Sequence, residues 1–263
     1  MGGVRTKVAW VLAAGWLLTQ AGGMEPPATE PKNRPETTQT LTPKAEPPTA
    51  EALAAAAAFE KRLVGVDAKM AAVADLRADF EQTKKTALLK KPLVSRGTLV
   101  CKGETVLWST TSPRRSDMLV GGGKVTVYYP DDALAEVYSM GAGFRDAAGG
   151  PLPRLMKLKD SFDFAELDAK QVSPGLKTSE LKGRIALKLT PRSGELKQHV
   201  ASVRVLIDES VPCADRMVIV DPDGDETELR FTSVKINTGM KDAELELKLP
   251  EGTRVSTPVE TRK

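Results

Sequence analysis

Short runs rich in β-branched, aromatic and alternating polar residues fill the chain between residues 76 and 129. The runs are Leu76–Thr83, Gly97–Cys101, Val106–Thr110 and Val125–Tyr129, with glycines or Pro113 in the gaps between them. β-branched and aromatic residues favour strands, whereas glycine and proline favour turns. Because these strands follow one another closely, the pattern predicts an antiparallel meander.

The same kind of pattern returns in the second half of the chain. Strands are predicted at 135–140, 185–189, 203–207, 217–220, 228–231 and 244–249. Asp223-Gly224 is a hairpin turn signal between two of these runs. In 244–249 leucines alternate strictly with charges, which indicates a final strand with one wet face. The runs 163–167 and 176–181 fit either strand or loop.

An alanine-rich helix is predicted to begin near residue 49, with Thr49 as its N-cap. Its apolar positions step by four, three, four and three residues, which places them on one stripe. They are Phe59, Leu63, Val66, Met70 and Val73. The stripe suits a two-helix coiled coil or a sheet as partner, and its length of about two heptads favours the sheet.

A second, shorter helix is predicted over Pro151–Leu158, directly after the glycine-rich stretch Gly141–Gly150. Leu152, Leu155 and Met156 share one side of it. An apolar helix after a flexible segment fits a lid over a binding site. An ordinary crossover helix has the same appearance.

These elements predict a mainly β fold with helices, of the α+β class. Two packed sheets would bury their inner faces against each other. A single strongly curved antiparallel sheet, an incomplete β-barrel, would instead be covered on its concave face by the helices. The long stripe on the first helix favours the single sheet.

The first 50 residues predict two segments that precede the folded domain of residues 51–263. Residues 1–23 combine Arg5 and Lys7, an apolar run and small residues at a cleavage spacing, which is typical of a signal peptide. An uncleaved anchor is the alternative. Residues 24–50 are rich in proline and polar residues and indicate a disordered linker. The sequence therefore predicts export to the periplasm.

Charge and motifs exclude several classes of function. Of 38 basic residues two lie in the leader, so 36 remain against 35 acidic ones, and no nucleic-acid partner is expected. Cys101, Cys213 and His199 form no metal-ligand cluster, and the two cysteines are either a disulfide or separate buried thiols. Asp221–Asp225 has the spacing of a turn rather than a calcium loop. We expect no cofactor, no metal and no enzyme activity.

Four segments together resemble the LolA-like family of outer-membrane lipoprotein carriers. The segment 76–83 is similar to the family's opening strand with its Phe-x-Gln motif. Trp108 with Thr111-Ser112-Pro113, the stretch from Gly123-Lys124 to Tyr128-Tyr129-Pro130, and the segment 223–255 follow in the family's order. The resemblance covers Glu51–Val255.

The resemblance implies an incomplete β-barrel closed by helices. It also implies acylated lipoprotein or lipid cargo, an inner-membrane ABC transporter as donor and an outer-membrane protein as acceptor. We expect a monomeric carrier without covalent chemistry. The family's arginine before the tryptophan, which latches the lid, is Leu107 here, and Arg114 or Arg115 would have to replace it.

Aromatic and methionine side chains are the candidates for a lipid-binding cavity, because methionine adapts to acyl chains of varied shape. They are Phe80, Trp108, Met118, Tyr128, Tyr138, Met140 and Phe231, with Leu152, Leu155 and Met156 as the lid. Each of these side chains could equally belong to an ordinary hydrophobic core. Which side chains face inward depends on strand register, because a one-residue slip exchanges the two faces. The alternative function is a periplasmic sensor or assembly factor that binds a protein or glycolipid on the same fold.

Overall fold

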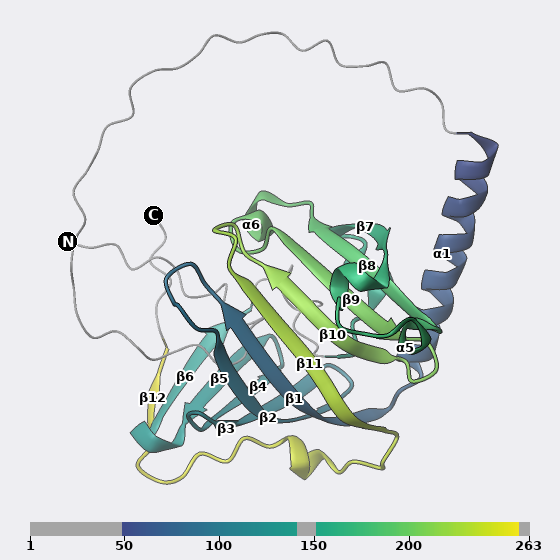
Figure 1. Ribbon diagram of the computed structural model, residues 1–263. Coiled ribbons are helices and arrows are strands. Elements are labelled where there is room, and N and C mark those ends of the chain that lie inside the picture. The colour runs from purple at the N-terminus through teal and green to yellow at the C-terminus, as the bar shows by residue number, and fades with distance from the viewer. Residues whose placement is uncertain (1–48, 141–150, 258–263) are drawn as a thin grey trace, which may run out of the picture.

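The computed structural model describes residues 49–140 and 151–257 and contains a single open, curved sheet of twelve strands (Figure 1). The predicted signal peptide, the linker up to residue 48 and the segment 141–150 lie outside the described residues. The strands are β1 Asp75–Lys85, β2 Leu93–Lys102, β3 Thr105–Ser112, β4 Ser116–Gly121, β5 Lys124–Tyr129, β6 Leu134–Ser139, β7 Phe162–Leu167, β8 Arg184–Pro191, β9 Ser202–Asp208, β10 Cys213–Val220, β11 Glu226–Ile236 and β12 Arg254–Ser256.

Two antiparallel meanders meet at the centre of the sheet. The strand order is β12-β6-β5-β4-β3-β2-β1-β11-β10-β9-β8-β7, so β1 to β6 form one half and β7 to β11 the other. The halves join where β1 pairs with β11, and Phe80 lies opposite Phe231 at this junction. Only β12 runs parallel to its neighbour, β6, among the strands described. The single curved sheet is thus mainly, but not wholly, antiparallel.

The helices are few and mostly short. They are α1 Ala50–Ala71, α3 Leu155–Leu158, α4 Ala169–Val172, α5 Thr178–Leu181, α6 Gly194–Lys197 and the 3₁₀ helices η2 Pro130–Asp132 and η3 Asp242–Leu245. Of the two runs that fitted either strand or loop, 163–167 is part of strand β7, whereas 176–181 contains helix α5. Across the described ranges, none of the helices has the length and apolar character needed to cross a membrane.

Two apolar clusters lie on the same face of the sheet, which we call the core face. Leu187 pairs with Val205, Val205 with Met217 and Met217 with Leu229, so these side chains share one face across the junction. Leu187 belongs to a cluster over β8 to β10. Leu229 belongs to a cluster that lies mainly over β1 to β6 and extends to β11 and to Cys213 of β10, which we call the β1–β6 cluster. Met217 packs against both clusters.

Helices α1 and α3 pack on the core face over β8 to β10. Leu63, Val66 and Met70 of the predicted stripe are buried there together with Leu155 of α3 and Ile185 of β8. On the opposite face, the short helix α4 packs on β8 and β9. The amphipathic stripe of the first helix therefore packs on the sheet, as its short length indicated.

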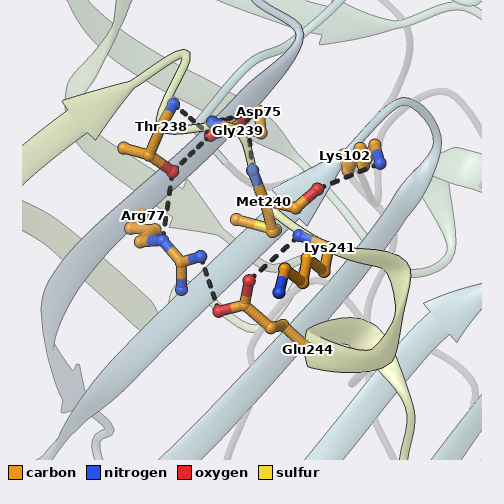
Figure 2. A network of polar contacts seen from close by, with 8 residues as sticks. All are labelled: Asp75, Arg77, Lys102, Thr238, Gly239, Met240, Lys241 and Glu244. Atoms are coloured by element: carbon orange, nitrogen blue, oxygen red, sulfur yellow. Dashed lines mark hydrogen bonds and ion pairs between the residues drawn. The ribbon is translucent and has the colours of Figure 1, made fainter.

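The segment after β11 crosses the other face of the β1–β6 half, which we call the outer face. Asp75 of β1 holds this segment in place. Its carboxylate accepts hydrogen bonds from Thr238 N and Oγ1 (both 2.7 Å), Gly239 N (3.0 Å) and Met240 N (3.1 Å) (Figure 2). These bonds, the Thr238 hydroxyl first, lower the pKa of Asp75 to about 2. Arg77 also donates to Glu244 of η3 at 2.6 Å.

The prediction of a strand at 244–249 is wrong. Asp242–Leu245 is a 3₁₀ helix that lies against β2 and β3, and the residues after it form no ladder. Leu245 is buried there, while Glu244 and Glu246 are exposed. The alternation of leucine and charged residues thus reflects a segment with one side buried against the outer face. Such a segment can have this pattern without pairing to another strand.

Candidate functional site

Three aromatic rings form the centre of the β1–β6 cluster. The Phe80 and Trp108 ring centroids lie 5.1 Å apart in an edge-on arrangement, and those of Trp108 and Phe231 lie 5.9 Å apart. In the pairing of β1 with β2, Gly97 lies directly opposite Phe80. A Cβ atom at Gly97 would lie 2.0 Å from the Ser109 carbonyl oxygen and 2.9 Å from the Phe80 ring, so only glycine fits.

The structure brings six of the seven predicted cavity residues into this one cluster. Met118 is opposite Trp108 on the neighbouring strand. Tyr138 lies on β6, and Met140 directly follows that strand. The six residues are Phe80, Trp108, Met118, Tyr138, Met140 and Phe231. Their assignment as lining of a lipid cavity stays a prediction.

Tyr128 lies outside the cluster, on the outer face. Its neighbour Val127 packs against the cluster and lies opposite Met118. Because successive side chains of a strand alternate between faces, Tyr128 is directed away from the cluster. The sequence pattern of β5 offered no way to choose between Val127 and Tyr128, since both residues favour strands.

Two buried polar atoms of the core face have no hydrogen-bond partner in the described part of the chain. They are the indole Nε1 of Trp108 and Oε1 of Gln82, which is the next core-face residue of β1 after Phe80. Both side chains are at least 95% buried. Buried donors and acceptors are almost always paired in folded proteins. The indole N–H could donate a hydrogen bond to a carbonyl oxygen of a ligand, and the Gln82 amide oxygen could accept one from an N–H or O–H group of a ligand.

The polar character continues along β1 beyond Gln82. Lys84 is buried on the same face, and desolvation lowers the pKa of its ammonium group, partly opposed by Asp225 and Asp221. The sequence pointed to Gln82 only as part of the Phe-x-Gln motif and not as a site residue, and it did not point to Lys84. The signal was present, because they continue the two-residue period of Phe80 along β1.

Of the three predicted lid residues, one lies where the two clusters meet and two lie at the β8–β10 cluster. Leu152 packs against both clusters, Leu155 is fully buried over β8 to β10, and Met156 packs at the edge of that cluster. The Met156 N–H donates to Asp67 of α1 at 3.3 Å. Pro151 accepts from the backbone N–H of Ala214 at 2.7 Å, so the segment is attached to both α1 and β10.

The predicted substitutes for the lid latch are engaged elsewhere or exposed. Arg114 donates to Asp132 beyond β5 at 2.6 Å, and Arg115 is exposed. Leu107 is half-buried on the outer face, because its neighbour Trp108 occupies the core face. Within the described residues, neither arginine forms a hydrogen bond or ion pair with Leu152, Leu155 or Met156.

The cysteines are two free thiols within the β1–β6 cluster. Burial raises the pKa of Cys101 and of Cys213 to about 12, so both stay protonated at neutral pH. His199 is a half-buried residue just after α6. In residues 49–140 and 151–257, no group of three or more metal-binding side chains occurs. Asp221 accepts from the backbone of Asp223 and Asp225, which makes this segment a turn.

A polar pocket lies on the outer face at the junction of the two halves. Its volume is about 480 Å³, and it is rimmed by Asp79, Glu81, Arg96 and Arg230. Arg96 donates to Glu81 at 2.7 Å across the β1–β2 pair. The pocket presents both acidic and basic side chains to a ligand, in contrast to the apolar core face.

The sequence model of the family described as outer membrane lipoprotein carrier protein LolA matches residues 71–247. This match includes β1 to β11 and the segment across the outer face. No curated protein is similar enough to the chain to count as a match.

Several solved structures are similar to the chain at low sequence identity. An uncharacterized conserved protein of Thermus thermophilus is 14% identical with a TM-score of 0.46, over 76% of this chain and 99% of its own. A LolA superfamily protein of Nitrosomonas europaea is 11% identical with a TM-score of 0.40, over 72% and 97%. The Pseudomonas aeruginosa MucA/MucB complex is 12% identical with a TM-score of 0.39, over 74% and 61%.

Proposed function

Because the chain belongs to the LolA family of outer membrane lipoprotein carriers, we propose that it is a periplasmic carrier of acyl chains. The cargo is a lipoprotein or a related lipid, bound on the core face of β1 to β6 and transferred towards the outer membrane. The observation that carries the proposal is the unpartnered Trp108 N–H inside an apolar cluster with Met118 and Met140. A purely structural core would pair or omit this donor.

Binding strength then determines how cargo leaves. Each buried methylene contributes about 0.8 kcal/mol, so ten of them give roughly 8 kcal/mol and slow spontaneous release. We propose that an inner-membrane ABC transporter loads the cargo and an outer-membrane acceptor takes it. The carrier itself performs no covalent chemistry.

Opening is proposed to occur at the seam between the two clusters. Leu152 packs on both clusters, and Met156 is tied to α1 through Asp67. Movement of the segment around Leu152, with loss of the Met156–Asp67 hydrogen bond, would uncover the β1–β6 part of the core face while α1 stays packed on β8 to β10 and the ladders of the sheet stay intact. In this proposal the core face is the concave face, with α1 and α3 covering its β8–β10 part and the segment around Leu152 reaching the β1–β6 part.

The first test is mass spectrometry of lipid extracted from the chain purified from its native periplasm without detergent. Bound acyl lipid or a co-purifying lipoprotein in stoichiometric amount is expected. Trp10 and Trp16 lie in the predicted leader, so Trp108 is the only tryptophan of the exported chain. A brominated fatty acid should therefore quench the intrinsic fluorescence of Trp108.

Absence of extracted lipid together with unchanged Trp108 fluorescence would overturn the carrier proposal. His199→Ala is the control for an enzyme, since a carrier keeps its lipid and its transfer rate in this variant. A hydrolase that used the single histidine would lose turnover instead.

The outer-face pocket favours a second candidate, a sensor or assembly factor that binds a protein or glycolipid. Its rim presents Arg230 and Asp79 to a polar partner. In that case Arg230→Ala would weaken binding of the partner and would leave the quenching of Trp108 by brominated lipid unchanged. Loss of Trp108 quenching without loss of partner binding would favour the carrier.

A further inference from the structure

Large apolar side chains are exposed at the turn between β1 and β2. Leu88 is 90% exposed and Leu89 44%, and Leu93 and Val94 are also exposed where β2 begins. Four of the nine exposed large apolar residues in the described chain lie within these seven positions. Each of the other stretches holds at most two such residues, so the hairpin turn is a concentrated apolar tip.

The tip is a well-defined turn, not a frayed end. The Leu89 N–H donates to the Thr86 carbonyl at 3.2 Å, and the Ala87 N–H donates to Asp225 of the β10–β11 turn at 3.3 Å. Figure 1 shows the β1–β2 hairpin standing out at one end of the sheet. Turn residues are normally polar, since exposed leucine contributes nothing to the folded state. Two consecutive exposed leucines in an ordered turn therefore point to a partner.

Charge around the tip indicates which partner. Lys90 and Lys91 follow the two leucines directly and form no ion pair within the described chain. The acidic neighbours lie in the β10–β11 turn and at the start of β11, where Asp225 also accepts from the Ala87 N–H, and their charges act on the strand lysines. Lys85 is 4.0 Å from Glu226, and Asp225 and Asp221 act on Lys84. The tip thus presents two leucines beside two free cations.

We propose that the β1–β2 turn docks on the surface of a bilayer that contains anionic phospholipid. Leu88 and Leu89 enter the boundary of headgroups and acyl chains, and Lys90 and Lys91 contact lipid phosphates. A convex tip suits a deformable lipid surface, because a protein partner would have to supply a groove around an almost fully exposed leucine. The alternative of a protein groove becomes an outcome of the test.

This inference does not depend on the proposed carrier function, although it complements it. Lys84 and Gln82 lie on the core face at the hairpin end of β1. Docking would therefore bring the polar end of the core face next to the bilayer, from which a lipid could enter.

The direct test places a fluorescent label at the tip of the exported chain. Leu88→Cys is labelled with bimane, while Cys101 and Cys213 are protected by their burial. Vesicles of phosphatidylglycerol and phosphatidylcholine with brominated acyl chains should quench the label. Leu53→Cys on α1, also exposed, is the matched control and should not be quenched.

Co-sedimentation with unbrominated vesicles separates the two contributions. The double variant Leu88→Asp with Leu89→Asp should bind about tenfold more weakly or worse, since the apolar contact is lost. Replacing Lys90 and Lys91 by glutamine should cost about fivefold for each lysine on anionic vesicles, and nothing on zwitterionic ones. Leu53→Asp should bind like the unchanged chain.

Equal quenching at positions 88 and 53, or vesicle binding that the two leucine substitutions leave unchanged, would overturn the proposal. Absence of vesicle binding together with protection of the position-88 label by periplasmic extract would overturn it in favour of a protein groove. Each variant must retain the near-ultraviolet circular dichroism of the parent, and Leu88→Ala provides a milder substitution with the same expected direction.

Discussion

The β8–β10 region and the β1–β6 half bury the same face of one sheet with different side chains. Over β8 to β10 the core face is largely aliphatic, with residues such as Leu187 and Ile185, and α1 and α3 pack on it. Over β1 to β6 the buried set includes Phe80, Trp108 and Met118, and no helix of the described chain contributes to that cluster. Unpartnered core-face polar atoms occur only in the second set, within the described ranges.

The carrier proposal builds on this difference, because it assigns stability to the β8–β10 region and binding to the β1–β6 half. A satisfied aliphatic core gains from being covered permanently. Aromatic rings, methionines and an unpaired indole N–H gain from an occupant that supplies carbonyl groups and apolar surface. The predictions below would break or sharpen that distinction.

The largest effect is expected from truncation in the covered region. Leu63→Ala removes a fully buried side chain of α1 and should lower the free energy of unfolding by about 2–5 kcal/mol. Val64→Ala, one position along and 49% exposed, should change it by less than about 0.5 kcal/mol. Urea denaturation measures both, and equal losses would show that α1 does not hold the β8–β10 region.

Next comes an acid-dependent loss of stability at Asp75. Its pKa is lowered from 3.8 to about 2 in the folded chain, so its contribution is present above pH 4 and is lost as the pH falls towards 2. Asp75→Asn should be less stable at pH 7 and should lack that part of the acid-induced decline. Thermal unfolding between pH 7 and pH 2 tests this, with the exposed Asp223→Asn as control. An unchanged acid profile would contradict the anchoring role.

A smaller effect is expected at Trp108. Trp108→Phe loses apolar volume but also removes an unpaired buried donor, so the free energy of unfolding should change by less than about 1 kcal/mol. Phe162→Leu in the other cluster has no such compensation and should cost about 1 kcal/mol or more.

Ligand binding provides the second measurement on the same variant. Titration calorimetry of Trp108→Phe should show about fivefold weaker binding of an acyl ester or amide and unchanged binding of a simple alkane. Equal weakening of both ligands would indicate that the indole acts through its shape alone.

The smallest effect is expected at the outer-face ion pair of Arg96 and Glu81. Both side chains are well exposed, so Arg96→Ala should change the free energy of unfolding by about 0.5 kcal/mol or less. A loss several times larger, measured by urea denaturation, would mean that the polar pocket also stabilises the junction of the two halves.

Much of the sheet could be predicted because alternation depends on local composition. Leu76–Thr83 and Val203–Ile207 show clear strand patterns, and the structure contains β1 and β9 there. β4 was missed, because Ser116 and Asp117 open it directly after Pro113-Arg114-Arg115, a turn-like stretch. Its strand character comes from pairing with β3 and β5 on both sides, which is not a local property.

The candidate site was only partly predictable for the same reason. Residue type identified Trp108 and Met118, but register decided that Val127 and not Tyr128 joins them. Gln82 reads as an ordinary polar residue until its strand position shows that it faces the core. The acceptor role of Asp75 depends on a backbone turn 163 residues away in sequence, which no local pattern reports.

The pairing of β1 with β11 also sets an order in which the fold can assemble. Within each half every strand pairs with its neighbour in sequence, so the two meanders can form through short loop closures. Phe80 and Phe231, by contrast, are 151 positions apart and meet only when both halves exist. One edge of β1 stays unpaired until β11 arrives, and closing this pair is expected to be the slow, rate-setting step of folding.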